Sequence, residues 1–179
     1  MTDAPTLNVA AVCAELVDRT LAHCIRSIEG LSEEEMHHIP YATANSIGFN
    51  VWHVARTIDN VLFFVFDRET PLWLQQGFND RFDLPKVAQG TGMSTEEAQA
   101  LHFPEPALFK EYLDALRVAC RARLEAATDE YFAGVVLLKP WGERSRLDHL
   151  GQVLIAHGNQ HLGMVSTARA LLGHGDLGF

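Results

Sequence analysis

The chain has 179 residues and a formal net charge of −9, with 47% hydrophobic and 21% charged residues. This composition is typical of a soluble globular protein, and we expect a single domain over residues 1–179. The excess of acidic residues argues against nucleic-acid binding, which needs a basic face. We recognise no signal peptide and no segment long and apolar enough to span a membrane, so we expect a cytoplasmic protein. Three cysteines without CxxC spacing, Cys13, Cys24 and Cys120, are typical of reduced, buried thiols.

Four long segments carry apolar residues at helical spacing. They cover residues 6–29, Asn45 or Ser46 to Asp67, Pro106 to Thr128, and Arg146 to Leu172. The second segment is rich in aromatic residues, which predicts a helix buried on more than one side. Four such helices in one small domain predict an all-α four-helix bundle with one long irregular connection.

Local signals mark several helix ends and turns between these segments. Ser32 with Glu35, and Ser94 with Glu97, match the capping box that begins a helix. Residues 131–143 contain apolar residues suited to short extended pieces. These signals predict short helical turns and a compact crossover, and no sheet of consequence.

The long connection covers residues 68–104 and is punctuated by prolines and glycines. A connection of this length in a small domain usually has a functional role. We expect it to pack over the open end of the bundle and to line a pocket with Trp73, Phe78 or Phe82. An aromatic loop that only caps the core is the alternative.

The fourth helix contains the sequence AHGNQHLGM, in which His157 and His161 lie four residues apart. At about 100° per residue, these side chains share one face, and a helical wheel places both in the middle of the apolar stripe. Leaving a polar group unpaired in a core costs about 1–3 kcal/mol, whereas one divalent ion satisfies both imidazoles. Helices also hold metal ions with this spacing. We therefore favour a metal-binding pair over two hydrogen-bonded core histidines.

A pair of histidines needs a third ligand from elsewhere in the chain. The candidates are His23, His37, His38, His53, His102, His149 and His174. His53 is the best of these because it lies on the strongly apolar second helix, although the wheel places it about 120° from the centre of that stripe. Either an exposed histidine or one that faces a polar cavity fits this position. His149 lies at the margin of the fourth stripe, and we predict that it is not a ligand.

Two motifs together are similar to those of a known family. The sequence SIGFNVWHVARTIDN on the second helix and HGNQHLGMVSTARALLG on the fourth resemble the DinB-like superfamily of bacterial four-helix bundles, which includes YfiT-type proteins. The resemblance implies a DinB-like bundle that holds a divalent metal ion, zinc or nickel, with His53, His157 and His161. It also implies, from some members, a thiol-dependent transferase that uses mycothiol or bacillithiol.

The sequence leaves three functions open. The first is a metal-dependent S-transferase that joins a low-molecular-weight thiol to a small electrophile. The second is a hydrolase that uses metal-bound water, and the third is a non-enzymatic metal-binding protein of a stress response. The expected partner is a small-molecule substrate, and a homodimer is left open. Arg56, Asn60 and Trp73 are the candidate substrate-binding residues, although a surface ion pair is the more ordinary role for Arg56.

Overall fold

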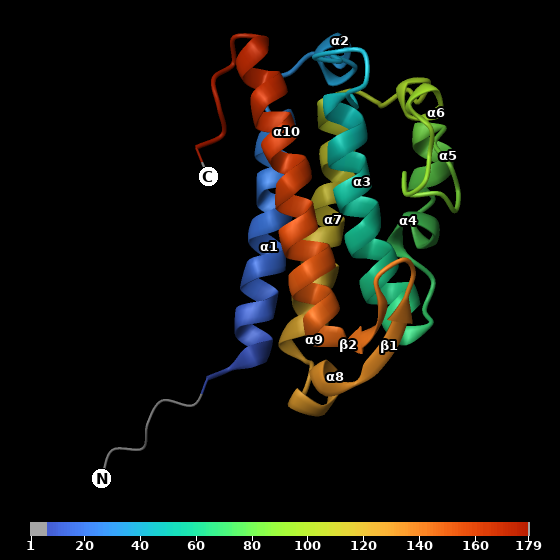
Figure 1. Cartoon of the computed structure of the whole chain (residues 1–179), viewed down its shortest axis with the longest axis vertical. Coiled ribbons are helices and arrows are strands. Elements are labelled where there is room, and N and C mark those ends of the chain that lie inside the picture. The colour runs from blue at the N-terminus through green and yellow to red at the C-terminus, as the bar shows by residue number, and fades with distance from the viewer. Residues whose placement is uncertain (1–6, 179) are drawn as a thin grey trace.

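Four long helices stand side by side in the computed structural model, which describes residues 7–178 (Figure 1). They are α1 (Val9–Ile28), α3 (Ile47–Asp59) with its π-helical continuation η1 (Asn60–Val65), α7 (Pro106–Glu125), and α10 (His157–Leu171), which follows α9 (Arg146–His149) and the π-helical segment η2 (Leu150–Ala156). The all-α four-helix bundle expected from the sequence is confirmed. Residue 6, where the first helix was expected to begin, lies outside the described residues.

Shorter elements join these helices. They are α2 (Glu33–Met36), α4 (Leu72–Gln75), α5 (Phe78–Phe82), α6 (Thr95–Gln99), α8 (Asp129–Ala133), and the strands β1 (Val135–Leu138) and β2 (Gly142–Ser145). The two strands form an antiparallel hairpin in which Val135 lies opposite Ser145. This hairpin contains the extended pieces predicted within residues 131–143.

Short-range capping contacts begin the helices where the sequence indicated. The Ser46 side chain accepts a hydrogen bond from the backbone N–H of Phe49 at 3.1 Å and so caps α3. Both predicted capping boxes, at the starts of α2 and α6, are formed. Such a cap contributes about 1 kcal/mol to helix stability.

The long connection runs back along the bundle from its lower end to its upper end. It leaves η1 near the hairpin, passes through α4 and α5, and reaches α6 beside the top of α3 (Figure 1). A 20-residue helix is about 30 Å long, so the chain needs many residues to make this return. As a result, α3 and α7 run in the same direction.

A buried carboxylate attaches the start of the connection to α3. Asp59 accepts hydrogen bonds from the backbone N–H groups of Leu72 and Trp73, both at 2.8 Å, and from the Tyr112 hydroxyl at 3.0 Å. Burial raises the pKa of Asp59, while these N–H donors and the nearby Arg56 lower it. The carboxylate therefore joins three elements, α3, α4 and α7, at one point.

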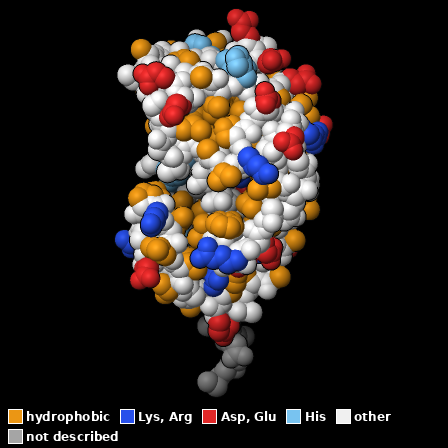
Figure 2. Space-filling model, turned by 90° about the vertical axis from the view of Figure 1, so that its right-hand side faces the viewer, with side chains coloured by type: hydrophobic (Ala, Val, Ile, Leu, Met, Phe, Trp, Pro, Cys, Tyr) orange, Lys and Arg blue, Asp and Glu red, His pale blue; other side chains and the backbone are white. Residues whose placement is uncertain are grey.

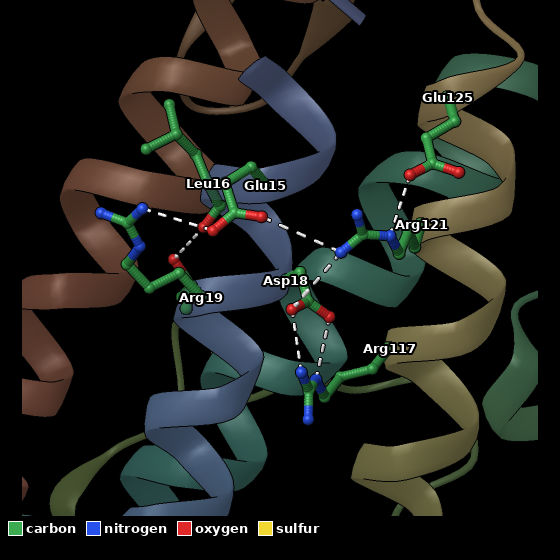
Figure 3. Close-up of polar contacts among 8 residues, drawn as sticks. Glu15, Leu16, Asp18, Arg19, Arg117, Arg121 and Glu125 are labelled. Carbon is green, nitrogen blue, oxygen red and sulfur yellow. Dashed lines mark hydrogen bonds and ion pairs between the residues drawn. The ribbon is translucent and has the colours of Figure 1, made fainter. Parts of the chain in front are cut away.

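Ion pairs connect α1 and α7 on the outside of the bundle. Arg117 of α7 donates two hydrogen bonds to the Asp18 carboxylate of α1, at 2.9 and 2.8 Å (Figure 3). Arg121 pairs with Glu125 at 2.9 Å on the same surface (Figure 3). The Arg121–Glu125 pair is exposed, and pairs of that kind contribute at most about 1 kcal/mol each. Arg117 and Arg121 thus pair with acidic side chains on the outside of the bundle.

The outer surface carries charges of both signs. On the face shown in Figure 2, acidic side chains gather at the upper end, and basic side chains lie mainly lower down. None of the described helices has the length and apolar character that a membrane crossing requires.

Candidate metal centre

Three histidine side chains from two neighbouring helices meet between α3 and α10. The Nε2 atom of His157 lies 3.4 Å from that of His53 and 3.1 Å from that of His161. One ring nitrogen from each histidine lies within 4.8 Å of the other two. Within residues 7–178, no other group of His, Cys, Asp or Glu side chains is close enough to hold a metal ion in this way.

Hydrogen bonds on the far side of two rings determine which nitrogen faces the cluster. The Nδ1 atom of His53 lies 2.5 Å from the backbone carbonyl of Gln89, which can only accept, so Nδ1 donates. The Nδ1 atom of His161 lies 2.8 Å from Oδ1 of Asn50. Asn50 donates its amide group to the Ser46 carbonyl at 2.9 Å, and this leaves Oδ1 as an acceptor. Both rings therefore carry a proton on Nδ1 and turn an unprotonated Nε2 atom toward the cluster.

The separations of the His157 Nε2 atom from the Nε2 atoms of His53 and His161 fit a single divalent ion. The Nε2 atoms of His53 and His161 can only accept, so without an ion the single proton of a neutral His157 ring would have to serve both of them. Two imidazole nitrogens bound to one ion at about 2.0–2.1 Å lie about 2.9 Å apart at a right angle and about 3.4 Å apart at the tetrahedral angle. The observed separations of 3.1 and 3.4 Å fall in this interval. Three neutral imidazoles are a donor set that suits zinc, nickel and similar ions.

Burial keeps the three imidazoles neutral. Together with the proximity of the other two rings, it lowers the pKa of His161 to about 3. Burial also lowers the pKa of His53, and the hydrogen bond to Gln89 opposes this effect in part. The pKa of His157 is lowered by burial too, against an opposing contribution from the backbone of Val153. A histidine must be neutral to bind a metal ion, so all three are in the binding form at neutral pH.

Wide helical turns precede the histidines of α10. Segment η2 is π-helical and ends directly before His157. Each π-type turn contains an extra residue and so rotates the side chains that follow it. The prediction that His157 and His161 occupy the middle of the apolar stripe is therefore wrong. Both rings are half-buried, whereas Leu162 beside them is fully buried. The rings lie at the margin of the core, where they face a pocket.

His53 is fixed in place by the close approach of the connection. Every residue of α3 is buried, and His53 is only 5% exposed, which excludes the alternative of an exposed histidine. Gly90 has a φ of +96°, and a Cβ atom there would lie 2.8 Å from Cζ of Phe49 and 2.9 Å from Nδ1 of His53. Only glycine combines this backbone conformation with so close an approach. Gly90 thereby allows the Gln89 carbonyl to reach the imidazole.

The three histidines line an open pocket of about 340 Å³. Its walls come from α3, η2 and α10, the β1–β2 hairpin, and residues 89–98 of the connection. Figure 2 shows a recess at the left edge of the molecule, with histidine atoms inside it. A pocket of this size accepts a small molecule. Among the described residues that line it, none is Asp, Glu or Cys, and Lys139 is the only lysine or arginine.

Comparison with known proteins agrees with this architecture. The sequence model that describes the DinB superfamily matches residues 16–165 of this chain. The chain belongs to the DinB superfamily. The crystal structure of a conserved protein from Enterococcus faecalis is similar to it, with a TM-score of 0.79 and 23% sequence identity, over 94% of this chain and 99% of that one. This similarity shows a shared fold. No curated protein matches the chain.

The candidate substrate-binding residues lie outside the pocket of this DinB-superfamily protein. Arg56, Asn60 and Trp73 are absent from the described residues that line it. The expectation of a surface ion pair for Arg56 is wrong, because its side chain is 1% exposed and lies 3.5 Å from the buried Asp59 carboxylate. The Arg56 guanidinium also stacks over the Trp73 ring, 4.9 Å from its centroid. Arg56 and Trp73 thus pack together in the core.

The connection lines the pocket, but with different residues from those expected. Trp73, Phe78 and Phe82 are buried, and the rings of Trp73 and Phe78 each lie 5.0 Å from the ring of Tyr112 on α7. Residues 89–98 face the pocket in their place. The residues of this stretch are mostly small or polar and have no periodic pattern of apolar residues. Gly90 was therefore the one sign in the sequence that the stretch approaches another part of the chain closely.

Other histidines lie away from the cluster. His149 is buried, and its Nε2 atom donates to the Val136 carbonyl at 3.1 Å. His174 lies near the C-terminal end and pairs with Glu35 at 2.8 Å. Neither belongs to the three-histidine group.

Proposed function

We propose that this protein is a metal-dependent enzyme of the S-transferase type. In this proposal, His53, His157 and His161 hold a divalent ion, zinc or nickel. A low-molecular-weight thiol gives up its proton to solvent, its sulfur forms a bond to a carbon atom of a small electrophile, and the bond from that carbon to its leaving group breaks. The observation that carries the proposal is the open pocket beside three converging, neutral imidazoles. In the described part of the chain, no fourth ligand joins the group. Structural zinc sites are closed by four protein ligands, whereas catalytic sites keep a position open for substrate.

The chemistry of the pocket favours a thiol over water as the nucleophile. Hydrolysis is assisted by a general base, and no carboxylate is found among the described residues that line the pocket. A thiol has a pKa of about 8.5 and ionises far more readily than water. A bound divalent ion supplies Lewis acidity that lowers this pKa further.

The thiol in this proposal comes from outside the chain. Cys13, Cys24 and Cys120 are all buried, and none of them lines the pocket. Burial raises the pKa of Cys24 to about 12, so this group stays protonated. A small thiol cofactor such as mycothiol or bacillithiol can instead enter from solvent. Three unpaired thiols also suit a reducing compartment, and we place the protein in the cytoplasm.

The surrounding residues orient the histidines. Gln89 and Asn50 hold the rings of His53 and His161 through their Nδ1 atoms. The Trp141 ring lies with its centroid 6.0 Å from that of His157 in an edge-to-face contact. Hydrogen-bond acceptors such as Gln89 and Asn50 fix the tautomer and direction of a histidine ligand and raise its basicity.

Metal titration tests the first part of the proposal. The protein is stripped with a chelator and titrated calorimetrically with zinc and with nickel, and we expect one ion per chain. His53→Ala, His157→Ala and His161→Ala should each lose most of the affinity. His174→Ala is the matched control, because His174 pairs only with Glu35 among the described residues, and it should bind as the wild type does. Failure of the wild type to bind a divalent ion would refute the metal centre.

Thiol binding tests the second part. Cobalt-loaded protein is titrated with cysteine, mycothiol and bacillithiol, and a thiolate-to-cobalt charge-transfer band is expected with at least one of them. Metal binding without such a band would refute the transferase. The hydrolase and the non-enzymatic stress-response protein would then be the surviving alternatives.

A further inference from the structure

The two ends of the pocket differ in chemistry. Side chains at intervals of four residues line the pocket along α3 and η1: Phe49, His53, Thr57 and Val61. The end beyond Phe49 is polar and contains Thr43, Asn45, Thr91, Ser94 and Thr95. The end beyond His53 is closed by the hairpin and is largely apolar, with Val61, Leu138, Pro140, Trp141 and Val153. We call this second region the hairpin end.

The hairpin end contains a buried hydroxyl that has no partner. Thr57 lines the pocket one turn beyond His53 and is only 4% exposed. Its Oγ1 atom has no hydrogen bond to any described residue. A threonine inside a helix commonly satisfies its hydroxyl through a backbone carbonyl one turn earlier, and an unpaired buried group is unfavourable. A hydroxyl left unpaired in a pocket wall is thus available to a ligand.

A single cation accompanies this hydroxyl. Lys139 lies in the turn between β1 and β2, lines the pocket, and is exposed. It forms no ion pair with another residue in the range 7–178, and no carboxylate from that range lines the pocket. Among the described residues that line the pocket, an anionic group therefore meets one positively charged side chain and no negatively charged one.

We propose that the hairpin end binds a small organic acid with an apolar body, in which the carboxylate pairs with Lys139 and a polar atom hydrogen bonds to the Thr57 hydroxyl. The apolar body packs against Trp141 and Val153. This inference rests on the proposed function, since it assigns the electrophile of that reaction to a chemical class. The Trp141 ring contacts His157, so a ligand in this end lies directly beside the three histidines.

The test compares an acid with its neutral analogue. The probes are 3-phenylpropionate and 3-phenylpropanol, titrated calorimetrically into metal-free and into zinc-loaded protein. The indole N–H signal of Trp141 reports local contact, because Trp52 and Trp73 are fully buried. In both forms we expect the acid to bind about fivefold more tightly than the alcohol, as for an exposed ion pair.

Two variants and a control separate the contributions of Lys139 and Thr57 to binding. Lys139→Met should remove the preference for the acid, while Lys110→Met, on the remote helix α7, should keep it. Thr57→Val should weaken both probes about fivefold. It should also raise the Tm of the free protein, because valine removes the unpaired hydroxyl without changing the shape of the side chain.

The possible outcomes distinguish a failure of the acid site from a failure of the metal centre. Equal binding of acid and alcohol, or a preference that survives Lys139→Met, would overturn the assignment. If the acid binds only to zinc-loaded protein and its affinity is unchanged in Lys139→Met, its carboxylate is a metal ligand and the hairpin end is not its site. If no divalent ion binds but the preference and its loss in Lys139→Met are observed, the acid site stands and the metal-dependent function fails.

Discussion

Replacement of Gly90 by alanine tests whether the long connection holds the metal centre in shape. Gly90 has a φ of +96°, and the new Cβ atom would lie 2.9 Å from Nδ1 of His53. Gly92, two residues on, has a φ of +80°, and no atom lies within 4 Å of the position of its Cβ. Gly92→Ala is therefore a matched control that introduces similar backbone strain in the same loop without a contact at the histidine.

The expected magnitudes follow from these two geometries. A left-handed backbone conformation costs an alanine about 1–2 kcal/mol, and both variants should lose this much stability. Gly90→Ala also places a carbon well inside the ordinary contact distance of about 3.5–4.0 Å, so the loop must move outward by roughly 1 Å. That shift breaks the 2.5 Å hydrogen bond between His53 and the Gln89 carbonyl. Loss of such an orienting partner typically lowers metal affinity 10–100-fold.

Zinc titration and urea denaturation of the two variants provide the assay. Gly90→Ala should bind zinc at least 10-fold more weakly than Gly92→Ala, whose affinity should match that of the wild type. Equal zinc affinity in Gly90→Ala and the wild type would show that the Gln89 carbonyl does not orient His53. An equal loss in both variants would assign the effect to general strain in the loop.

Three further predictions concern His149, the effect of pH and Asp59. His149→Gln should leave the stoichiometry of metal binding unchanged, because His149 hydrogen bonds to Val136 away from the cluster; loss of metal would mean that the ligand set is wrong. In metal-free protein the folded-state pKa of His161, about 3, lies below its unfolded value near 6.5, so the unfolded state binds more protons and stability falls with pH below about 6.5. Through His161 alone, the free energy of unfolding measured by urea denaturation should fall by about 1 kcal/mol between pH 6.5 and 5.5. An equally steep fall in His161→Gln would contradict this. Asp59→Asn should lower the free energy of unfolding by about 3 kcal/mol, because it leaves the Arg56 guanidinium buried without its counter-charge, and a loss below about 1 kcal/mol would count against the anchoring role.

Much of the fold is determined by short-range features of the sequence. The cap at Ser46, the capping boxes and the proline at the start of α7 lie where the sequence indicated, because each involves residues at most a few positions apart. The spacing of His157 and His161 likewise brought two imidazoles to one side of one helix. The DinB-like resemblance, and not periodicity, selected His53 as their partner.

Only the tertiary structure decided how these residues form a site. A helical wheel assumes a constant 100° per residue, and the π-helical turns of η2 rotate His157 and His161 away from the position that it predicts. His53 is buried because the connection returns along α3 and covers it, and the Gln89 carbonyl becomes its partner 36 residues along the chain. Arg56 and Trp73 looked suited to a substrate but pack together in the core. The contacts that decide these roles join residues far apart in sequence, and local patterns carry no information about which distant segment will cover a given face.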